Sequence, residues 1–431
     1  MPVQSTTKIA ALLNALRKDE IDLLDYLKQV QLHFESIEPS LMAFVEELDR
    51  FERLTQDAKQ LEERYPNPDS RPPLYGLPIG IKDIFHVDGF ETHAGSQLPT
   101  EALAGAEADS VTKLKEAGAL IFGKTITTEF AYFAPGPTRN PHNPEHTPGG
   151  SSSGSAAAVG AGLCTVALGT QTIGSVNRPA AFCGVYGFKP SYNRISKESV
   201  IPLSISLDHV GILASDLPGA ALVAGVLCKD WQEVEASESL TLGIPVGPYL
   251  EKASGEGRQH FEDSVAKLDN AGYATVEVET MPNFDEIVER HNLIVAAEAA
   301  HTHAEWFSKY EDKYHQRTAD LIRKGQQVDT GELEAATKSR LELRRDLTET
   351  MEQHGIDYWI TPSAPGPAPK GLDSTGDPIM NLPWTQSGLP SLTLPSGLNA
   401  EGLPLALQVI GRWYADEAVF ADSIQINAAL K

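Results

Sequence analysis

The chain has 431 residues, and 59 acidic against 35 basic side chains give it a net charge of −24. This charge repels phosphate backbones and anionic lipid, so we expect no nucleic-acid partner and no membrane association. Hydrophobic residues make up 41% and charged residues 22%, as in ordinary globular proteins. The sequence has neither a run of about 18 apolar residues nor the features of a secretory signal, which indicates a cytoplasmic protein.

Helices are expected over residues 7–65, where apolar side chains recur at spacings of three and four. A proline-rich loop at 66–73 then leads into a segment, 74–211, that is rich in glycine, serine and threonine. Within it, residues 111–125 predict a helix, a glycine stop and a buried strand, which together form half of a βαβ unit.

The second half of the chain mixes strands with a long helical region. A helix is expected around 216–228, a strand at 240–246, a helix–glycine–strand unit at 261–279, helices over 283–353, and short strands at 357–364, 390–397 and 405–411. Because strands occur along the whole chain, we predict one large α/β/α domain over 1–431. Its central sheet is expected to be mixed, mostly parallel and twisted, with N-terminal helices (1–65), a core (74–211) and a helical cap region (283–353).

Candidate metal ligands are few. Three cysteines lie in apolar stretches without a CxxC pair, so buried free thiols are expected at Cys164, Cys183 and Cys228. A second group falls on differing faces of one helix and is expected near a substrate entrance or on a solvated face: Glu298, His301, His303 and Glu305. We therefore predict no metal site.

The densest chemical signal is TPGGSSSGSAAAVGAG at 147–162. Gly149 and Gly154 have P-loop spacing, but Ser155 and Ala156 stand where a P-loop needs lysine and a hydroxyl. A nucleophile elbow fits Gly150–Gly154 less well, because a proline-rich loop precedes it instead of a strand. A low-complexity surface loop is disfavoured because AAAVGAG is typical of a tightly packed helix. A glycine-flanked serine turn within a larger serine-hydrolase site is preferred.

Two further segments could complete such a site. Small residues around Ser175, in 169–190, leave successive backbone N–H groups bare, as in an oxyanion hole. Lys82 lies in an apolar run, 77–84, with Asp83 pointing to the other side. A lysine in such a run is usually a surface residue with a buried stem. If it is buried, its pKa falls and the neutral amine can act as a base.

Together these segments resemble the amidase-signature family. Lys82-Asp83, Pro-Gly-Gly-Ser-Ser at 148–152, Gly-Thr-x-Thr-x-Gly-Ser at 169–175 and Pro-Ala-Ala-Phe-Cys-Gly at 179–184 follow in the order of that family. The resemblance runs from about residue 20 to the C-terminus. The family spacing of 24 residues between Ser151 and Ser175 is also kept.

The resemblance implies the amidase-signature fold and a Ser–cis-Ser–Lys relay. Ser175 would attack an amide carbonyl, and Ser151, after a cis peptide bond, would pass the proton to neutral Lys82. The oxyanion would be bound by backbone N–H groups of Thr172, Ile173, Gly174 and Ser175, and the substrate by a pocket near Ala131 and Tyr132. No metal or organic cofactor is implied.

The nucleophile loop departs from the family pattern at three positions. Gln171, Ile173 and Asn177 stand where the family has Asp, Gly and Arg. We interpret this as an ion pair replaced by neutral amides, with Gln171 bonding to Asn177, or with Arg178 taking over. The N–H of Ile173 is retained, but its branched side chain is expected to crowd the acyl pocket.

Other candidates are interpreted as structural. Ser110 and Lys113 match S-x-x-K but lie on an amphipathic helix without companion motifs. By resemblance Glu129 is structural and Asp208 supports the sheet edge. Cys183 is expected in the core.

The preferred function is hydrolysis of a small carboxamide through an acyl-enzyme on Ser175, with release of ammonia or an amine. One alternative is the glutaminase subunit of a tRNA-dependent amidotransferase, and another is an inactive family member that acts as a binding protein. The partner is expected to be a small-molecule amide, which the sequence does not identify. A homodimer is compatible with a chain of this size.

Overall fold

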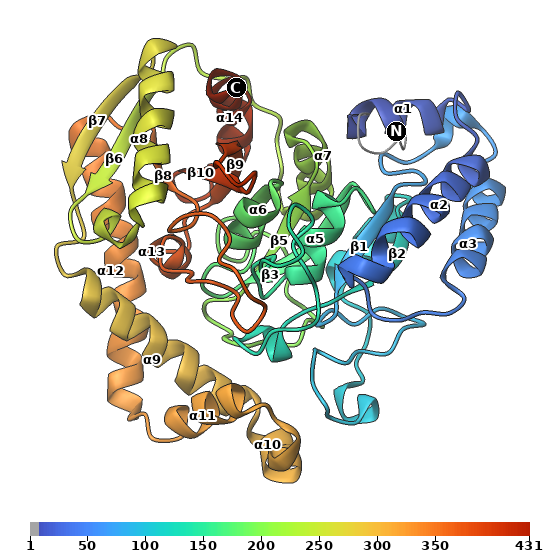
Figure 1. The fold of residues 1–431 in the computed structure, drawn as a ribbon, viewed down its shortest axis with the longest axis horizontal. Coiled ribbons are helices and arrows are strands. Elements are labelled where there is room, and N and C mark those ends of the chain that lie inside the picture. The colour runs from blue at the N-terminus through green and yellow to red at the C-terminus, as the bar shows by residue number, and fades with distance from the viewer. Residues whose placement is uncertain (1–7) are drawn as a thin grey trace.

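The computed structural model describes residues 8–431 and contains one ten-stranded sheet (Figure 1). The strands are β1 (Pro78–Lys82), β2 (Leu120–Thr125), β3 (Val166–Gln171), β4 (Tyr186–Lys189), β5 (His209–Ala214), β6 (Thr241–Val246), β7 (Ala274–Glu279), β8 (Tyr358–Pro362), β9 (Ser391–Leu398) and β10 (Pro404–Ile410). They lie side by side in the order β2-β1-β3-β5-β4-β9-β10-β8-β6-β7. Strands from both ends of the chain share this one sheet, as we predicted.

The sheet is mixed, but the expectation that it is mostly parallel is wrong. Four neighbouring pairs are parallel, at the two ends of the sheet, and the five pairs across its middle are antiparallel. The parallel pairs β1–β2 and β6–β7 are the helix–glycine–strand units that the sequence indicates, because a crossover helix returns the chain in the same direction. In the middle, β9 and β10 are joined by only a short turn and therefore pair antiparallel.

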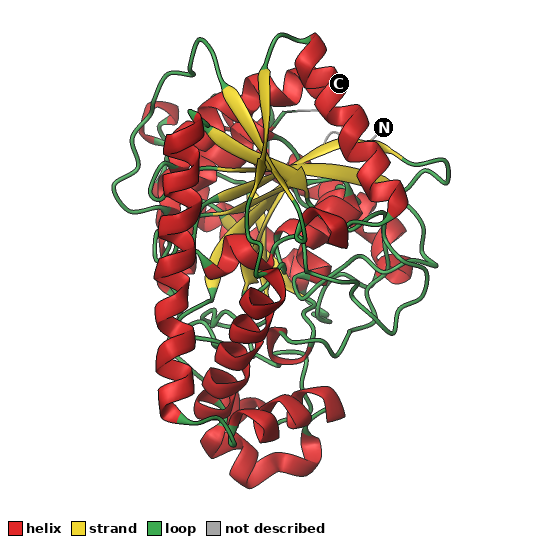
Figure 2. Cartoon of the chain, turned by 90° about the vertical axis from the view of Figure 1, so that its left-hand side faces the viewer, coloured by secondary structure: helices red, strands yellow, loops and turns green. Residues whose placement is uncertain are grey.

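Helices cover both faces of the sheet (Figure 2). The predicted N-terminal helices are confirmed as α1 (Ile9–Arg17), α2 (Leu23–Leu41) and α3 (Arg50–Arg64), while residue 7 lies outside the described part. The remaining sheet-flanking helices are α4 (Asp109–Glu116), α5 (Ser153–Gly160), α6 (Asn177–Cys183), α7 (Leu217–Leu227), α8 (Gly255–Asn270), α13 (Leu382–Gln386) and α14 (Asp416–Leu430). Between residues 8 and 431, no helix is both long and apolar enough to span a bilayer.

Helix α5 explains the small residues of the serine-rich segment. A side chain at Gly154 would place its Cβ 2.1 Å from the carbonyl oxygen of Ala43 and 2.4 Å from the nitrogen of Ile126. Both neighbours are main-chain atoms that cannot move aside, so only glycine fits. The segment is therefore a packed helix, and a low-complexity surface loop is excluded. The three cysteines are buried and unpaired, as expected.

The predicted cap region forms an arm that extends away from the sheet (Figures 1 and 2). It consists of α9 (Phe284–Thr302), α10 (Ala304–Tyr310), the 3₁₀ turn η6 (Glu311–Lys313), α11 (Gln316–Gly325) and α12 (Thr330–His354). The far part of the arm contacts the core at residues 129–131. The Glu129 carboxylate accepts hydrogen bonds from the backbone N–H of His315, and the ring of Phe130 stacks on Tyr314 at 5.3 Å.

This contact fixes an unusual stretch of main chain. Phe130 and Ala131 have φ angles of 46° and 60°, which are unfavourable for residues that carry a Cβ. Phe130 is enclosed by aromatic side chains of the arm, including His303 at 4.5 Å and Trp306 at 6.0 Å. The packing of the arm thus determines where Ala131 and Tyr132 point.

Candidate active site

Lys82, the last residue of β1, is completely buried. Its Nζ donates hydrogen bonds to Ser151 Oγ at 2.7 Å and to Thr170 Oγ1 at 2.8 Å. No carboxylate of residues 8–431 forms an ion pair with it; the adjacent Asp83 instead pairs with Lys124. Burial lowers the pKa of Lys82 to about 7, against a smaller opposing effect of the Asp208 carboxylate. The surface interpretation of this lysine is therefore wrong, and Asp83 does point to the other side.

Ser151 follows a cis Gly150–Ser151 peptide bond, in the loop that precedes α5. The carbonyl oxygen of Gly150 accepts a hydrogen bond of 2.6 Å from Arg178 Nη2, and the carbonyl oxygen of Ser151 accepts one of 3.2 Å from the N–H of Thr128. The main chain around the serine is thus held by two different segments, while its hydroxyl faces Lys82.

Ser175 lies in the loop between β3 and α6, next to Ser151. The N–H of Ser152 approaches the carbonyl oxygen of Ser175 at 3.4 Å. The Ser175 side chain lines a narrow pocket together with Ala131, Tyr132 and Ile173. Its hydroxyl makes no hydrogen bond to any described residue, so the expected Ser151–Ser175 contact is not formed as a hydrogen bond in the free protein.

The predicted oxyanion loop has free donors. Of the residues described, none accepts a hydrogen bond from the backbone N–H of Ile173, Gly174 or Ser175. The carbonyl groups of the same loop are occupied: that of Ile173 accepts from Thr385 Oγ1 at 2.6 Å, and that of Gly174 from the N–H of Arg178 at 2.9 Å. The loop is thus anchored through its carbonyls and leaves N–H groups available for an anion.

The departures from the family pattern have a structural explanation. Gln171 Oε1 accepts hydrogen bonds from the backbone N–H groups of Val176 (2.8 Å) and Asn177 (2.9 Å), and its Nε2 donates to Thr385 Oγ1. A neutral amide does brace the loop, but it reaches the main chain of Asn177 rather than its side chain. The side chain of Asn177 instead donates to the carbonyl oxygen of Gly187 and to Thr393 Oγ1.

Asp208 anchors the other side of the loop. Its buried carboxylate accepts hydrogen bonds from Thr172 Oγ1 (2.5 Å) and from the backbone N–H groups of Leu203 and Ser204. Burial raises the pKa of this carboxyl group. Asp208 therefore supports the loop that carries Thr172 and the segment 203–208, rather than only the edge of the sheet.

The remaining candidates form no site. Ser110 is buried on α4 and Lys113 pairs with Asp109. Among residues 8–431, no group of histidine, cysteine and acidic side chains could hold a metal ion. His301 and Glu305 are solvated as expected, whereas His303 is buried with its Nδ1 3.0 Å from Tyr314 Oη. The expectation that all four lie at an entrance or on the surface is thus wrong for His303, because aromatic side chains enclose it.

A cavity of about 580 Å³ opens beside the narrow pocket at Ser175. The two spaces share the side chains of Tyr132, Phe133, Ile173 and Pro378. Four charged residues line the larger cavity: Arg317, Asp320, Lys324 and Asp377. We call it the outer cavity. Ala131, the second predicted pocket residue, lies at the narrow pocket instead.

Two residues close to Lys82 and Ser151 have roles that the sequence did not predict. Thr170 Oγ1 accepts a hydrogen bond from Lys82 Nζ, as Ser151 Oγ does, and Arg178 donates one to the carbonyl oxygen of Gly150. Thr170 belongs to the Gly-Thr-x-Thr-x-Gly-Ser segment, so the motif contained a signal for it. Arg178 is suggested by the sequence only as a substitute for Asn177.

Comparison with known proteins identifies the family to which this chain belongs. The family model described as Amidase matches residues 25–420. The chain belongs to the Amidase family. One component of the glutamyl-tRNA(Gln) amidotransferase of Trichlorobacter lovleyi is 31% identical, over 83% of this chain and 84% of that protein. Its counterpart in Geobacter metallireducens is also 31% identical, over 94% and 93%. A solved amidase structure is 30% identical with a TM-score of 0.88 and covers 96% of this chain and 98% of its own.

Membership of this family agrees with the resemblance that the motif order indicates, and the mixed sheet flanked by helices is the fold of its solved members.

Proposed function

We propose that this member of the Amidase family hydrolyses a carboxamide through an acyl-enzyme on Ser175. The observation that carries the proposal is the buried hydrogen bond between Lys82 Nζ and Ser151 Oγ. A lysine whose pKa lies near 7 is substantially neutral at physiological pH and can accept a proton. An ammonium kept only for structure would need a counter-charge in such a buried place.

In the proposed reaction, Ser175 Oγ attacks the amide carbonyl while its proton passes through Ser151 to Lys82. The developing oxyanion is bound by the free N–H groups of Ile173, Gly174 and Ser175. Lys82 then returns the proton through Ser151 to the departing nitrogen, and water hydrolyses the ester on Ser175. Thr170 keeps the Lys82 amine directed at Ser151.

The charged residues of the outer cavity favour a substrate that itself carries charge. The Arg317 guanidinium donates only to the backbone carbonyls of Phe133 and Asp373. The Lys324 ammonium has no hydrogen-bond or ion-pair partner within residues 8–431, and the Asp377 carboxylate accepts only from the N–H of Ile379. Both signs of charge are therefore available to a ligand. A substrate that carries a carboxylate, an ammonium or both beside its carboxamide complements these groups.

Active-site labelling tests the chemistry. A fluorophosphonate probe is expected to modify the wild type and to fail on Ser175→Ala. Ammonia release from a panel of primary amides, matched in size but bearing a carboxylate, an ammonium, both or neither, tests the cavity. Charged members are expected to show the higher kcat/KM and to lose more than about tenfold in Arg317→Met or Asp377→Asn. Absence of labelling and of hydrolysis would contradict the proposal and favour an inactive binding protein.

A second candidate is favoured by the relatives. Both proteins named above are components of glutamyl-tRNA(Gln) amidotransferases, and the identity extends over most of this chain. In that case the amide donor is glutamine, whose amino-acid group complements Arg317 and Asp377, and partner proteins use the ammonia. Purified chain that releases ammonia from small amides without partners supports a free-standing amidase. Glutamine hydrolysis that appears only after partner proteins are added supports the amidotransferase role.

A further inference from the structure

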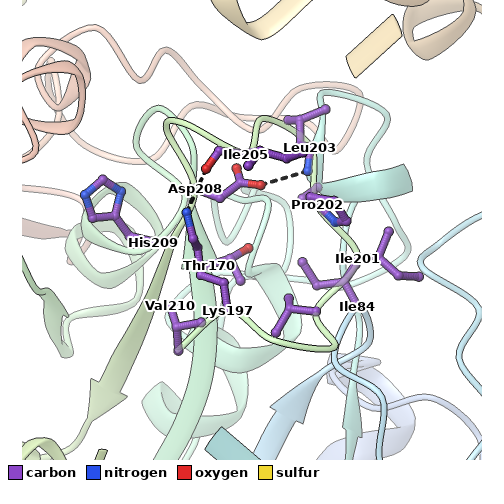
Figure 3. A pocket seen from close by; sticks show the side chains of 12 residues that line it. Ile84, Thr170, Lys197, Ile201, Pro202, Leu203, Ile205, Asp208, His209 and Val210 are labelled. Atoms are coloured by element: carbon purple, nitrogen blue, oxygen red, sulfur yellow. Dashed lines mark hydrogen bonds between the residues drawn. The ribbon is translucent and has the colours of Figure 1, made fainter. Parts of the chain in front are cut away.

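A second cavity borders the Ser175 pocket and has no lining residue in common with the outer cavity (Figure 3). Its volume is about 150 Å³, and Ile84, Val200, Ile201 and Leu203 form much of its wall. We call it the inner chamber. It shares Ala131 and Leu203 with the narrow pocket at Ser175, so the chamber and the space beside the proposed nucleophile adjoin at these two residues.

Most polar groups of the inner chamber already have hydrogen-bond partners within the protein. Lys197 Nζ donates to the carbonyl oxygen of Ile205 at 2.7 Å and to Tyr192 Oη at 3.1 Å. The Asp208 carboxylate is occupied by Thr172 and by two backbone N–H groups, and Thr170 Oγ1 accepts from Lys82. His209 has its Nδ1 at the carbonyl oxygen of Leu207, and its ring lies apart from the other labelled side chains (Figure 3).

An apolar occupant therefore suits the chamber better than an ion. Among the described residues that line the chamber, His209 Nε2 is the only buried side-chain nitrogen or oxygen without a hydrogen-bond partner, so a charged or strongly polar ligand would lose its hydration and gain few partners in return. An apolar cavity of about 150 Å³ is known to hold a benzene ring. The chamber thus matches a short alkyl group or a single aromatic ring.

The position of the chamber indicates which part of a substrate enters it. Thr170, which lines the chamber, is hydrogen-bonded to Lys82, and Lys82 to Ser151, so the chamber lies on the side of the proton-carrying groups. A general acid must be adjacent to the nitrogen that it protonates. The charged outer cavity, which shares no wall with the chamber, is then left for the acyl part.

We propose that the inner chamber binds an apolar substituent on the departing nitrogen, so that N-substituted amides are substrates. This inference rests on the proposed hydrolysis at Ser175. As the C–N bond breaks and the Ser175 Oγ–acyl bond forms, the proton of Ser175 passes through Ser151 and Lys82 to the nitrogen. The product is a primary amine whose alkyl or aryl group occupies the chamber, and water later releases the acid.

The test compares amides that share one acyl group and differ only at nitrogen: unsubstituted, N-methyl, N-butyl and N-benzyl. For the wild type, kcat/KM is expected to rise at least about tenfold from the unsubstituted to the N-butyl amide, as for a group that enters an apolar pocket. Val200→Phe, which fills the chamber, should abolish this gain, so that kcat/KM falls at least about tenfold more for the N-butyl amide than for the unsubstituted amide. Val200→Ala should move the preference toward N-benzyl.

Val234→Phe is the matched control, because it makes the same change at an exposed position. Two results would overturn the inference: a wild type that prefers the unsubstituted amide, or a Val200→Phe variant that loses activity equally on all four amides while its melting temperature is unchanged. Neither result contradicts the proposed function, because the wild type hydrolyses amides at Ser175 in both cases. Loss of all hydrolysis and of fluorophosphonate labelling in the wild type would instead remove the proposed function itself.

Discussion

Arg178 and Gly150 are joined by a hydrogen bond of 2.6 Å from the guanidinium to the carbonyl oxygen of the peptide that precedes Ser151. The same side chain donates to the carbonyl oxygen of Gly376 and to Thr375. One arginine in the first turn of α6 thus holds the main chain that presents Ser151. This geometry makes Arg178 a positioning residue for the proposed relay, although it touches neither hydroxyl.

Replacement of Arg178 by methionine should lower kcat more than about tenfold, because three oxygen atoms, two of them buried, lose their donor and the Gly150–Ser151 peptide loses its anchor. KM is expected to change less than kcat. Arg412→Met is the control. Arg412 also donates to a main-chain carbonyl, that of Ile356, but it lies away from the site, so its loss should leave kcat unchanged. Equal loss in both variants would argue against the positioning role. Steady-state kinetics on one amide suffice.

The lowered pKa of Lys82 predicts the pH dependence of activity. The relay needs the neutral amine, so kcat/KM should rise with pH and level off above about 7. Lys82→Met should lose about 10²- to 10⁴-fold in kcat. A kcat/KM that falls as pH rises through 7 would show that the charged ammonium is required and would contradict the proposed role.

The same lysine contributes to stability. In the folded protein Lys82 releases its proton above pH about 7, whereas in the unfolded chain it keeps the proton up to about 10.5. The unfolded state thus binds more protons in this interval, so the contribution of Lys82 to the free energy of unfolding rises with pH between 7 and 10.5. Urea unfolding of wild type and Lys82→Met at pH 7 and 9.5 measures it. The difference between the two proteins should shift in favour of the wild type at the higher pH.

Gly154→Ala should destabilise the protein severely. The new Cβ would meet main-chain atoms of Ala43 and Ile126 at 2.1 and 2.4 Å, so α5 and the two main-chain segments around these residues must separate. We expect a loss of at least about 2 kcal/mol, as in other overpacked cores. Gly255→Ala, at the first residue of α8 with open space around it, should be neutral or stabilising by about 0.5–1 kcal/mol. Comparable thermal melts for the two variants would refute this account of the small-residue segment.

Ile173→Gly should widen the range of acyl groups. The Ile173 side chain lines both the narrow pocket and the outer cavity, while its N–H stays free in either variant. Amides with bulky acyl groups should therefore gain in kcat/KM relative to small ones, by about tenfold for each additional methylene group that the pocket accommodates. If the ratio does not change, the isoleucine does not limit the acyl group.

The sequence allowed the relay to be predicted because its members lie in short motifs with fixed spacing. Lys82, Ser151 and Ser175 each carry a local signal, and glycine and small residues around them indicate close packing. The direction of the central strands was not predictable in the same way. Apolar runs such as those of β9 and β10 show that a strand exists, but whether neighbours are parallel depends on how the chain returns between them.

The residues that line the cavities were not predictable from the sequence for a similar reason. Arg317 and Asp377 are separated by many residues and meet only because α11 packs beside the segment 373–379. Neither residue belongs to a motif. The sequence predicts that a neutral amide at Gln171 braces the loop, but it does not predict the groups that the amide binds. These are backbone N–H groups, which every residue except proline carries, so the sequence does not distinguish them.

The helical arm is anchored on the core at Glu129 and Phe130, so the proton-transfer groups and much of the cavity wall belong to different parts of the chain. The proposed relay lies on short strands and loops of the core, whereas many residues that line the outer cavity belong to helices of the arm, more than a hundred residues later in the chain. Descendants of one ancestor can consequently exchange ligands by remodelling those helices, without disturbing the proton-transfer groups. Libraries confined to residues 284–325 are therefore a rational route to new selectivity in this scaffold.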